Sequence, residues 1–551
     1  MSKIKIFALG GLNEEGKNMY VVKVDNDIFV FDAGLKYASD KLLGVDYVIP
    51  NFDYIKENIK NIKGLFITHG HEKNMGAVCD IIKEIPKIKV FATRFTADIL
   101  KKELESENIK FKNLVVIDPH KKINFGKNSI FPVRLTHSIP DNVGYALNTH
   151  DGTIFYTGNY VFDATMLGPY KADIGKLAYI GKQGVLCLLG ESMYADKIGY
   201  TSPKNRISKL IRDTLSKTDN RIIVTVFTAH VSRIEELFKE ISKTTRRVVV
   251  MGHKLQGIIN DILDSKYLDF DKSRIGDLSN INDKDAVILI SNEREKPFMN
   301  LNRIINGYDK FVKIKQTDTV FFMEPINDYN EKLAIKVIDD ISKAGASVVT
   351  MSKKDNLLHH ASSEDIMLML DLMNPKYYMP VIGEYRHMVA NANAASHIGM
   401  KKENILLKQN GDVCEFIDGK LNLKCFDKVK VDEILVDGNN GEDVGNLVLK
   451  DREMLGENGI VIVSCTLDRS TKKIVGGPEI LTRGFIYVKD NQELLEQTRE
   501  LCVLIINDNI LENTKRVDYS KIKNEVRERL GHFFYEKTES KPMIITVIQE
   551  V

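Results

Sequence analysis

The sequence contains no tryptophan, and its six cysteines are scattered singly along 551 residues. No two of them form a Cys-x-x-Cys pair, so the sequence indicates neither a disulfide framework nor a thiolate zinc ribbon. No apolar run is long enough to cross a bilayer, and the first residues lack the apolar core and cleavage site of a secretory signal. We therefore expect a cytoplasmic protein with no membrane segment.

The chain also lacks an excess of charge of either sign. It has 78 lysines and arginines against 76 aspartates and glutamates, which gives a net charge of +2. A protein whose main task is to hold nucleic acid is usually more basic than this. We interpret the short basic runs Arg246-Arg247 and Lys401-Lys402 as solvated faces. Length and an ordinary apolar content predict about three or four globular domains.

The first 200 residues or so alternate β-rich runs with turns, and two pairs of runs have the spacing of antiparallel hairpins. The expected strands are Ile4–Leu9, Met19–Val24, Ile28–Asp32, Lys63–Thr68, Ile130–Thr136, Tyr145–Thr149 and Thr153–Thr157.

From about residue 202 to residue 355 the pattern changes to helices alternating with buried strands, which predicts an α/β insertion with a parallel sheet. We expect strands at Arg221–Phe227, Arg247–Met251, Ala286–Ser291 and Thr319–Met323, and helices at Arg233–Lys243 and Asn330–Ala344.

A short strand is expected at Tyr377–Ile382, although Pro380 interrupts it. The last hundred residues predict a small α/β unit. Its strands are expected at Gly459–Ser464, Gly484–Val488 and Met543–Ile548, and its helices at Glu493–Ile506 and Lys521–Phe534.

Polar residues stand where several of these strands end. His69-Gly70-His71 follows one strand, and Asp32, His137 and Asn159 follow others. Two histidines at positions i and i+2 can point into one pocket and bind a divalent metal through their imidazole nitrogens. Such a pair alone is weak support for a metal site, because strand-end histidines also pack and hydrogen-bond to one another.

This order of landmarks resembles the metallo-β-lactamase fold, and specifically the ribonuclease J family. The resemblance extends along the whole chain, insertion and C-terminal part included. Its motifs are Gly-Gly-Leu-Asn-Glu-Glu-Gly-Lys-Asn-Met-Tyr at 10–20, Leu-Gly-Val-Asp-Tyr-Val-Ile-Pro at 43–50, Thr-His-Ser-Ile-Pro-Asp at 136–141, Gly-Glu-Tyr-Arg at 383–386, Gly477-Pro478 with Arg-Gly-Phe-Ile-Tyr at 483–487, and the tail from Tyr535-Glu536-Lys537-Thr538 to Glu550-Val551.

The resemblance implies an αββα metallo-β-lactamase sandwich, an inserted α/β β-CASP domain and a small C-terminal α/β domain. We expect the sandwich to consist of residues 1–203 and 368–436, with the β-CASP domain at 204–367. A linker at 437–457, with its glycines and acidic residues, would lead to the C-terminal domain at 458–551. In the family, this last domain supports dimer formation.

The resemblance also implies a metal site. Family members use two zinc ions to activate a water that attacks the RNA phosphodiester. Their signature is H-x-H-x-D-H, followed by a histidine, a bridging aspartate and a distant histidine. His69, His71 and His137 match the three imidazoles of the first metal.

The ligands of the second metal are replaced. Lys73 stands at the signature aspartate and Asn74 at the next histidine, Asn159 at the bridging aspartate and Ile382 at the distant histidine. Neither an ammonium nor an isoleucine can donate a lone pair to a metal. We therefore expect at most one zinc ion per chain, held by the three histidines, and no metal at all if those histidines are only structural.

Three further positions match residues of the family: Asp32, Glu191 and His360. In the family, the residue at the position of Asp32 supports the loop that carries the metal ligands. All three could now be structural rather than catalytic. We expect Lys73 to form an internal ion pair with Asp32.

Two segments of the insertion depart from the family. Its phosphate-cradling Gly-Ser-Gln-Gly-Glu-Pro aligns with residues 291–297, where Glu293 and Glu295 face the expected phosphate path. Its Ser-Gly-His-Gly aligns with Leu358-His359-His360-Ala361, which keeps His360 but not the phosphate-binding serine. No RNA-contacting residue can be assigned from the sequence.

Three hypotheses follow. In the first, the chain is an impaired or inactive ribonuclease J-type subunit for RNA processing and degradation, pairing with an active ribonuclease J paralogue or with itself as a dimer or tetramer. In the second, it is an active 5′–3′ exoribonuclease or endoribonuclease that uses one zinc at His69, His71 and His137. In the third, it is a binding module that holds RNA or a protein partner in the old cleft.

Overall fold

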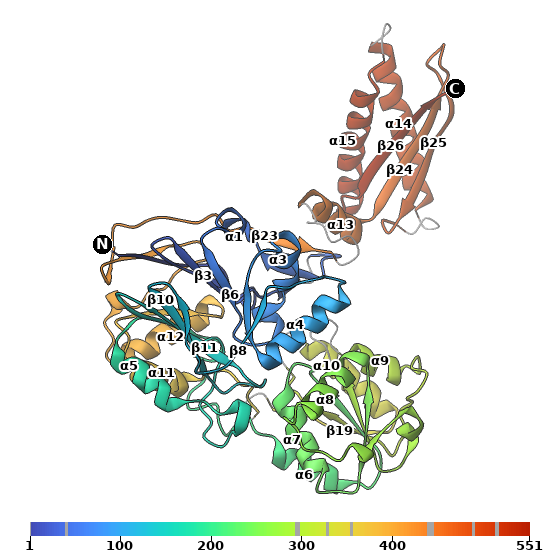
Figure 1. The fold of residues 1–551 in the computed structure, drawn as a ribbon. Coiled ribbons are helices and arrows are strands. Elements are labelled where there is room, and N and C mark those ends of the chain that lie inside the picture. Colours follow the sequence, from blue (N-terminus) through green and yellow to red (C-terminus); the bar gives the residue numbers. More distant parts are fainter. Residues whose placement is uncertain are drawn as a thin grey trace. The chain divides into compact units, whose positions relative to one another are not determined.

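The computed structural model describes residues 2–38, 42–291, 298–326, 330–352, 356–437, 446–486, 491–512 and 517–551. The chain divides into two compact units. One comprises residues 1–37 and 48–434, and the other comprises residues 38–47 and 435–551 (Figure 1). None of the described helices is both long and apolar enough to cross a membrane.

The first unit contains a sandwich of two sheets. The first sheet has the order β22-β21-β1-β2-β3-β6-β7-β8, and the predicted hairpin is present as the antiparallel pair β2–β3. From β3 onward the neighbours β6, β7 and β8 are parallel. The strands are β1 (Lys3–Gly10), β2 (Met19–Val24), β3 (Asp27–Phe31), β6 (Ile62–Phe66), β7 (Val90–Thr93), β8 (Leu114–Ile117), β21 (Cys414–Ile417) and β22 (Lys420–Leu421).

The second sheet has the order β20-β13-β12-β11-β10-β9. Pro380 is accommodated because β20 is an edge strand, where a missing N–H costs no ladder hydrogen bond. The strands are β9 (Ile123–Phe125), β10 (Asn128–Arg134), β11 (Val143–Thr149), β12 (Gly152–Tyr156), β13 (Val185–Glu191) and β20 (Tyr377–Val381). A further small sheet contains β4 (Lys36–Tyr37), β5 (Tyr47–Pro50) and β23 (Glu433–Val436).

An aromatic core fills the space between the two sheets. Phe31 and Phe66 of the first sheet pack on Tyr145 of the second, with ring centroids 5.8 and 5.7 Å apart. Helices α5 (Ile174–Gln183), α11 (Ser363–Met373) and α12 (Tyr385–His397) form a separate core with the outer face of the second sheet. Helix α4 (Arg94–Ser106) contacts β7 and β8 of the first sheet. Three shorter helices precede it in the chain: α1 (Asp53–Glu57), α2 (Glu72–Met75) and α3 (Val78–Glu84). The predicted αββα sandwich is confirmed.

The inserted domain is built on a parallel sheet of order β16-β15-β17-β14-β18-β19, with separate apolar cores on its two faces. Its continuous β-branched runs are typical of strands covered on both sides. The strands are β14 (Ile222–Val226), β15 (Arg247–Met251), β16 (Ile275–Gly276), β17 (Ala286–Ser291), β18 (Thr319–Phe322) and β19 (Ser347–Val349). The helices are α6 (Ser208–Lys217), α7 (Val231–Ile241), α8 (His253–Asp264), α9 (Met299–Ile305) and α10 (Glu331–Lys343). The predicted parallel α/β insertion is confirmed, and Figure 1 shows it in green beside the sandwich.

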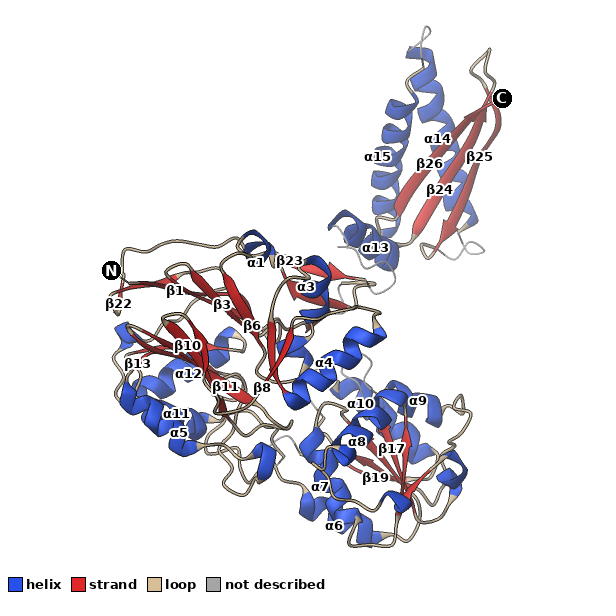
Figure 2. Cartoon of the chain, viewed as in Figure 1, coloured by secondary structure: helices blue, strands red, loops and turns tan. Residues whose placement is uncertain are grey.

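The second unit contains a three-stranded sheet of order β25-β24-β26, with α14 and α15 packed on one face (Figure 2). Its elements are α13 (Asn446–Asn458), β24 (Ile460–Leu467), β25 (Ile474–Arg483), α14 (Gln492–Glu512), α15 (Tyr519–Thr538) and β26 (Met543–Glu550).

Two expectations for this unit need comment. The strand expected at Gly484–Val488 is wrong in its described part, because the strand runs earlier and ends at Arg483; residues 487 and 488 lie outside the described residues. The sequence did not predict this strand because Gly476-Gly477-Pro478 are residue types typical of turns. The register of its pairing with β24 shifts next to these residues. In the expected linker, residues 446–457 belong to α13, and residues 438–445 lie outside the described residues. The predicted domain boundaries stay a prediction.

Candidate metal centre

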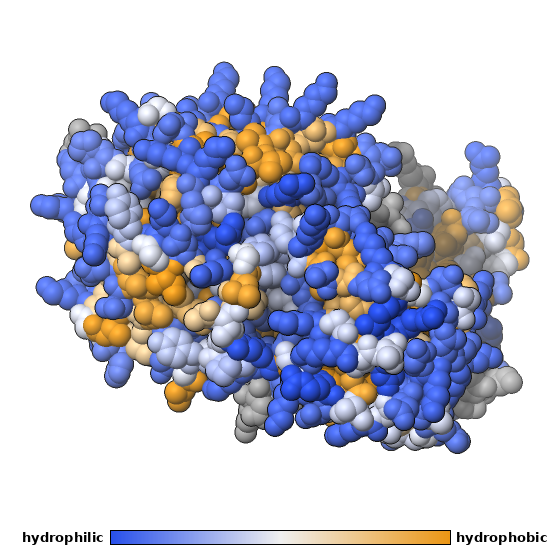
Figure 3. All heavy atoms as spheres, turned by 60° about the horizontal axis from the view of Figure 1, so that its bottom comes forward, coloured by the Kyte–Doolittle hydropathy of each residue, from blue (hydrophilic) through white to orange (hydrophobic). Residues whose placement is uncertain are grey.

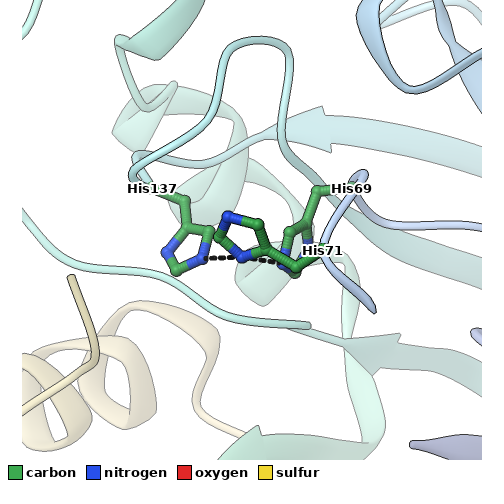
Figure 4. A group of neighbouring side chains, drawn as sticks. All are labelled: His69, His71 and His137. Carbon is green, nitrogen blue, oxygen red and sulfur yellow. Dashed lines mark hydrogen bonds between the residues drawn. The ribbon is translucent and has the colours of Figure 1, made fainter. Parts of the chain in front are cut away.

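Three histidines converge where strands of the two sheets end. His69 and His71 follow β6, and His137 follows β10. Nε2 of His69 and Nε2 of His137 each lie 3.1 Å from Nδ1 of His71 (Figure 4). His69 and His137 are buried, and His71 is partly exposed at the first residue before α2.

The neighbouring hydrogen bonds fix the protons on two of these rings. The hydroxyl of Thr68 donates to the Asp32 carboxylate, so its oxygen must accept the 2.9 Å hydrogen bond from Nδ1 of His69. Nε2 of His71 donates to the carbonyl of Ala229 at 2.9 Å. In their neutral forms, His69 and His71 therefore direct lone pairs at each other across 3.1 Å.

Two facing lone pairs repel unless a proton or a metal ion lies between them. Burial lowers the pKa of both His69 and His137 well below the usual range of histidine, so a proton is not retained there at neutral pH. Zinc with Zn–N bonds of about 2.0–2.1 Å and tetrahedral angles places its nitrogen ligands about 3.3 Å apart. The three nitrogens therefore fit one zinc ion, with a fourth position left for water.

Lys73 does not reach Asp32. Its ammonium forms an ion pair with Glu15, and both side chains line the wall of the adjoining pocket. The expected Lys73–Asp32 pair is therefore wrong. Asp32 is fully buried, so an ammonium there would lose its hydration, whereas the long lysine side chain keeps 21% of its surface exposed at the pocket.

Neutral donors hold Asp32 in place. It accepts hydrogen bonds from the backbone N–H of Thr68, from Nδ2 of Asn74 and from the hydroxyl of Tyr156, each 2.7 Å long. Burial raises the pKa of Asp32 to about 6. Asn74 thus uses its amide to anchor a carboxylate beneath the histidine loop rather than to ligate a metal.

Asn159 has a similar role beside Glu191. Its Nδ2 donates to Oε2 of Glu191 at 2.7 Å, and Nδ1 of His360 lies 3.0 Å from the same oxygen. The other oxygen of Glu191 accepts from the backbone N–H groups of Tyr160 and Ala361. Glu191 is fully buried and organises both loops, so both Asn159 and His360 are oriented by it.

Ile382 keeps a strained backbone but carries no donor atom. Its φ is 56°, in the left-handed region, where a β-branched residue costs about 1–2 kcal/mol. Its backbone N–H donates to the carbonyl of Gly11, and its carbonyl accepts from the N–H of Ser192. The side chain is buried and lines the pocket.

The pocket lies between the sandwich and the inserted domain, and its described charges nearly cancel. Lys73 pairs with Glu15, and Lys254 pairs with Glu72 at 3.2 Å. Burial, with a contribution from Glu72, raises the pKa of Glu103 to about 7. Among the described residues the lining therefore offers a phosphate no surplus of positive charge.

The structure brings most of the predicted site residues to one place. The pocket lining includes His71, Lys73, Asn74, His137, Asn159, His360 and Ile382, while His69, Asp32 and Glu191 are buried next to them. The acidic segment with Glu293 and Glu295 lies outside the described residues. The sequence analysis missed His230 and His359, which also line the pocket. The one available signal was that His230 follows a strand end.

A two-sheet sandwich with an inserted parallel domain and histidines at its strand ends defines the metallo-β-lactamase fold with a β-CASP insertion. A solved structure described as a protein of unknown function from Enterococcus faecalis V583 shares this fold. Its TM-score is 0.53 at 13% identity, covering 75% of this chain and all of that one.

The comparisons of sequence are more specific. The profile "Ribonuclease J, beta-CASP domain" matches residues 219–341, and "Ribonuclease J C-terminal domain" matches residues 447–551. Ribonuclease J2 of Bacillus subtilis (strain 168) is 37% identical over 552 residues, covering 100% of this chain and 99% of the relative. Ribonuclease J 2 of Staphylococcus epidermidis (strain ATCC 35984) is 35% identical, covering 100% of this chain and 98% of the relative. The chain belongs to the ribonuclease J family.

The contact between Asn159 and Glu191 generates a stability prediction. Asn159→Asp would place two buried carboxylates about 2.7 Å apart, and we expect it to lower the free energy of unfolding of metal-free protein by about 3 kcal/mol. Thermal unfolding with a chelator present measures the loss. It should be smaller at pH 5 than at pH 8, because protonating one carboxylate removes the repulsion. Asn108→Asp, at an exposed position, is the control. An unchanged unfolding midpoint for Asn159→Asp at pH 8 would contradict this reading.

Proposed function

We propose that this chain is a cytoplasmic RNA-processing subunit of the ribonuclease J family whose own nuclease activity is impaired or absent, and that it acts by pairing with an active ribonuclease J. The observation that carries the proposal is the chemistry at the three positions of the family's second metal, which are Lys73, Asn74 and Ile382, and at the bridging position, Asn159. Lys73 and Ile382 have no lone pair to offer, and the amides of Asn74 and Asn159 are engaged with buried carboxylates.

Two-metal hydrolysis needs cations on both the attacking and the leaving oxygen. The donor set here fits one zinc at most, on His69, His71 and His137. Such a zinc, when bound, supplies a polarised water. The chain's own contribution is to hold the ligands: Asp32 acts through Thr68 to orient His69, and the carbonyl of Ala229 orients His71.

The electrostatics support the same proposal. The ion pairs Lys73–Glu15 and Lys254–Glu72 use up the two lysines of the pocket lining. Figure 3 shows a mostly hydrophilic face interrupted by hydrophobic patches, and the whole chain carries a net charge of only +2. Neither the pocket nor the chain as a whole has the positive excess that grips a polyanion.

The C-terminal unit provides a surface suited to pairing. Residues alternate along its strands, so one face of the sheet is buried under α14 and α15, and among the described residues of this unit the other face is open (Figure 2). On the open face, Ile462 lies opposite Leu481 on one side and Ile545 on the other. Leu481 and Ile545 are 47% and 41% exposed. Three adjacent apolar side chains on an uncovered sheet are typical of an association surface.

The first prediction from this proposal concerns activity. With a 5′-monophosphorylated RNA, the lone chain should show turnover at least about 100-fold below that of an active ribonuclease J measured in parallel, with or without added zinc or manganese, because the second cation is missing. Gel analysis of the decay over time measures this. Robust turnover by the lone protein would refute the proposal.

A second candidate function is hydrolysis with a single zinc, and the converging ring nitrogens favour it. Its test uses the same assay. If activity is found, His71→Ala should abolish it, whereas His150→Ala should not, since His150 is a hairpin residue with 94% of its side chain exposed. Turnover that survives His71→Ala rules this candidate out.

The second prediction concerns pairing. We expect the chain and an active ribonuclease J to elute together in size-exclusion chromatography with light scattering, and Leu481→Glu to weaken the association at least about tenfold, because the charge would have to be desolvated in an apolar contact. Leu504→Glu is the matched control, on an exposed position of α14. The pairing surface is wrong if the two substitutions have equal effects, and pairing itself is wrong if the unaltered chains never associate.

A further inference from the structure

The inserted domain contacts the loop of the sandwich that carries the third histidine, residues 137–141. The carbonyl of Ser138 accepts a 2.9 Å hydrogen bond from the backbone N–H of Ser232. Oδ2 of Asp141 accepts a 2.6 Å hydrogen bond from the hydroxyl of Tyr267, which follows α8. Both donors belong to the inserted domain, so this loop is held from a second domain.

Apolar packing and a further hydrogen bond reinforce the contact. Ile139, in the same loop, is 1% exposed and shares an apolar core with Val231 and Ile234 of α7. The hydroxyl of Tyr170, in the sandwich, donates to the carboxylate of Glu235, which is also on α7. Because separating the loop from α7 would expose this apolar surface to water, we expect the two to move together.

The same end of α7 also fixes the ring of His71. The carbonyl of Ala229, two residues before α7 begins, accepts the 2.9 Å hydrogen bond from Nε2 of His71. That bond leaves Nδ1 of His71 directed at the other two histidines, 3.1 Å from a nitrogen of each. The segment from Ala229 to Glu235 therefore positions the His71 ring and the loop that carries His137.

The remaining ligand is held by the sandwich. His69 is oriented through Thr68 by the buried carboxylate of Asp32. Zinc needs its nitrogen ligands about 3.3 Å apart, which allows little displacement of one ring relative to another. The three nitrogens meet that requirement while the inserted domain is docked, by which we mean that residues 229–235 contact the loop 137–141.

We propose that residues 229–235 of the inserted domain are a positioning element of the metal centre, so that zinc binding by the three histidines and docking of the inserted domain favour each other. Such coupling is reciprocal, because a ligand that binds only one arrangement also stabilises it. In a chain with one metal position, the ion then acts as a link between two domains. The inference rests on the proposed function in one respect, the single zinc position, and requires neither turnover nor pairing.

The experiment follows one backbone amide. Ser232 is the second residue of α7, and amides in the first turn of a helix have no acceptor within the helix. Its N–H bonds to the carbonyl of Ser138 in the sandwich, so its exchange with deuterium measures undocking. Exchange of the full chain is followed by mass spectrometry with fragmentation that resolves single residues, first with a chelator and then at a series of free zinc concentrations.

At free zinc about ten times its dissociation constant, which chelator competition measures separately, exchange of the Ser232 amide should slow about tenfold, because undocking then requires zinc release. The amides of β24, in the C-terminal unit, are the internal control and should not respond to zinc. His69→Ala removes the ligand that the sandwich holds, and it should abolish the zinc dependence.

The coupling also predicts an effect from the docking side. Tyr170→Phe combined with Tyr267→Phe keeps both rings but removes two hydrogen bonds to carboxylates that join the domains. Without zinc, the Ser232 amide of this double variant should exchange at least about tenfold faster. Tyr377→Phe is the matched control, because its hydroxyl accepts from the N–H of Leu421 within the sandwich, and it should leave this exchange unchanged. Far-UV circular dichroism verifies that the variants keep their secondary structure.

Zinc that binds the chain without slowing exchange at Ser232 would overturn the inference, as would exchange in the double variant equal to that of Tyr377→Phe. A chain that binds no zinc would also overturn it, yet would leave the proposed function standing. The proposed function fails instead on robust turnover or on absence of pairing.

Discussion

The arrangement of the site depends on two hydrogen-bond chains that leave a lone pair on His69 and a lone pair on His71 facing each other. One runs from His69 through Thr68 to Asp32, and the other runs from His71 to the carbonyl of Ala229. The first belongs to the sandwich and the second comes from the inserted domain. The position of the His71 ring is therefore set by how the two domains pack, and a metal ion held between the rings would relieve the repulsion of the two lone pairs.

In the other half of the site, the side chains at positions 74 and 159 hold buried carboxylates, and those at 73 and 382 offer no lone pair to a metal. Ile382 holds the left-handed backbone that its loop requires, although its side chain can bind nothing. Asn74 and Asn159 satisfy Asp32 and Glu191 as hydrogen-bond donors, which a carboxylate at position 159 could not do. The two asparagines are thus compatible with each other, because each gives a buried carboxylate a hydrogen-bond donor in the absence of a second metal ion. This compatibility supports the proposed role of the chain beside an active relative.

Much of the fold could be predicted from the sequence because its strands are long apolar runs bounded by clear turns, as in the inserted sheet. The strand at Ile474–Arg483 could not, because glycines and a proline within it are turn-type residues. The convergence of His69, His71 and His137 was predictable from spacing and resemblance. The partner of Lys73 was not, because it depends on the cost of desolvating an ammonium next to Asp32, which spacing does not report. The pairing of His230 with His359, 129 residues apart, depends on how two segments of the insertion fold together.

The central proposal is that the chain keeps the three histidines of the first metal position, without the bridging aspartate, and holds no second metal ion. The most direct test is the zinc content of the purified chain at zinc saturation, measured by elemental analysis after removal of loosely bound metal. The account predicts no more than one zinc ion per chain, lost when the three-histidine cluster is disrupted. Two tightly bound zinc ions per chain would contradict it.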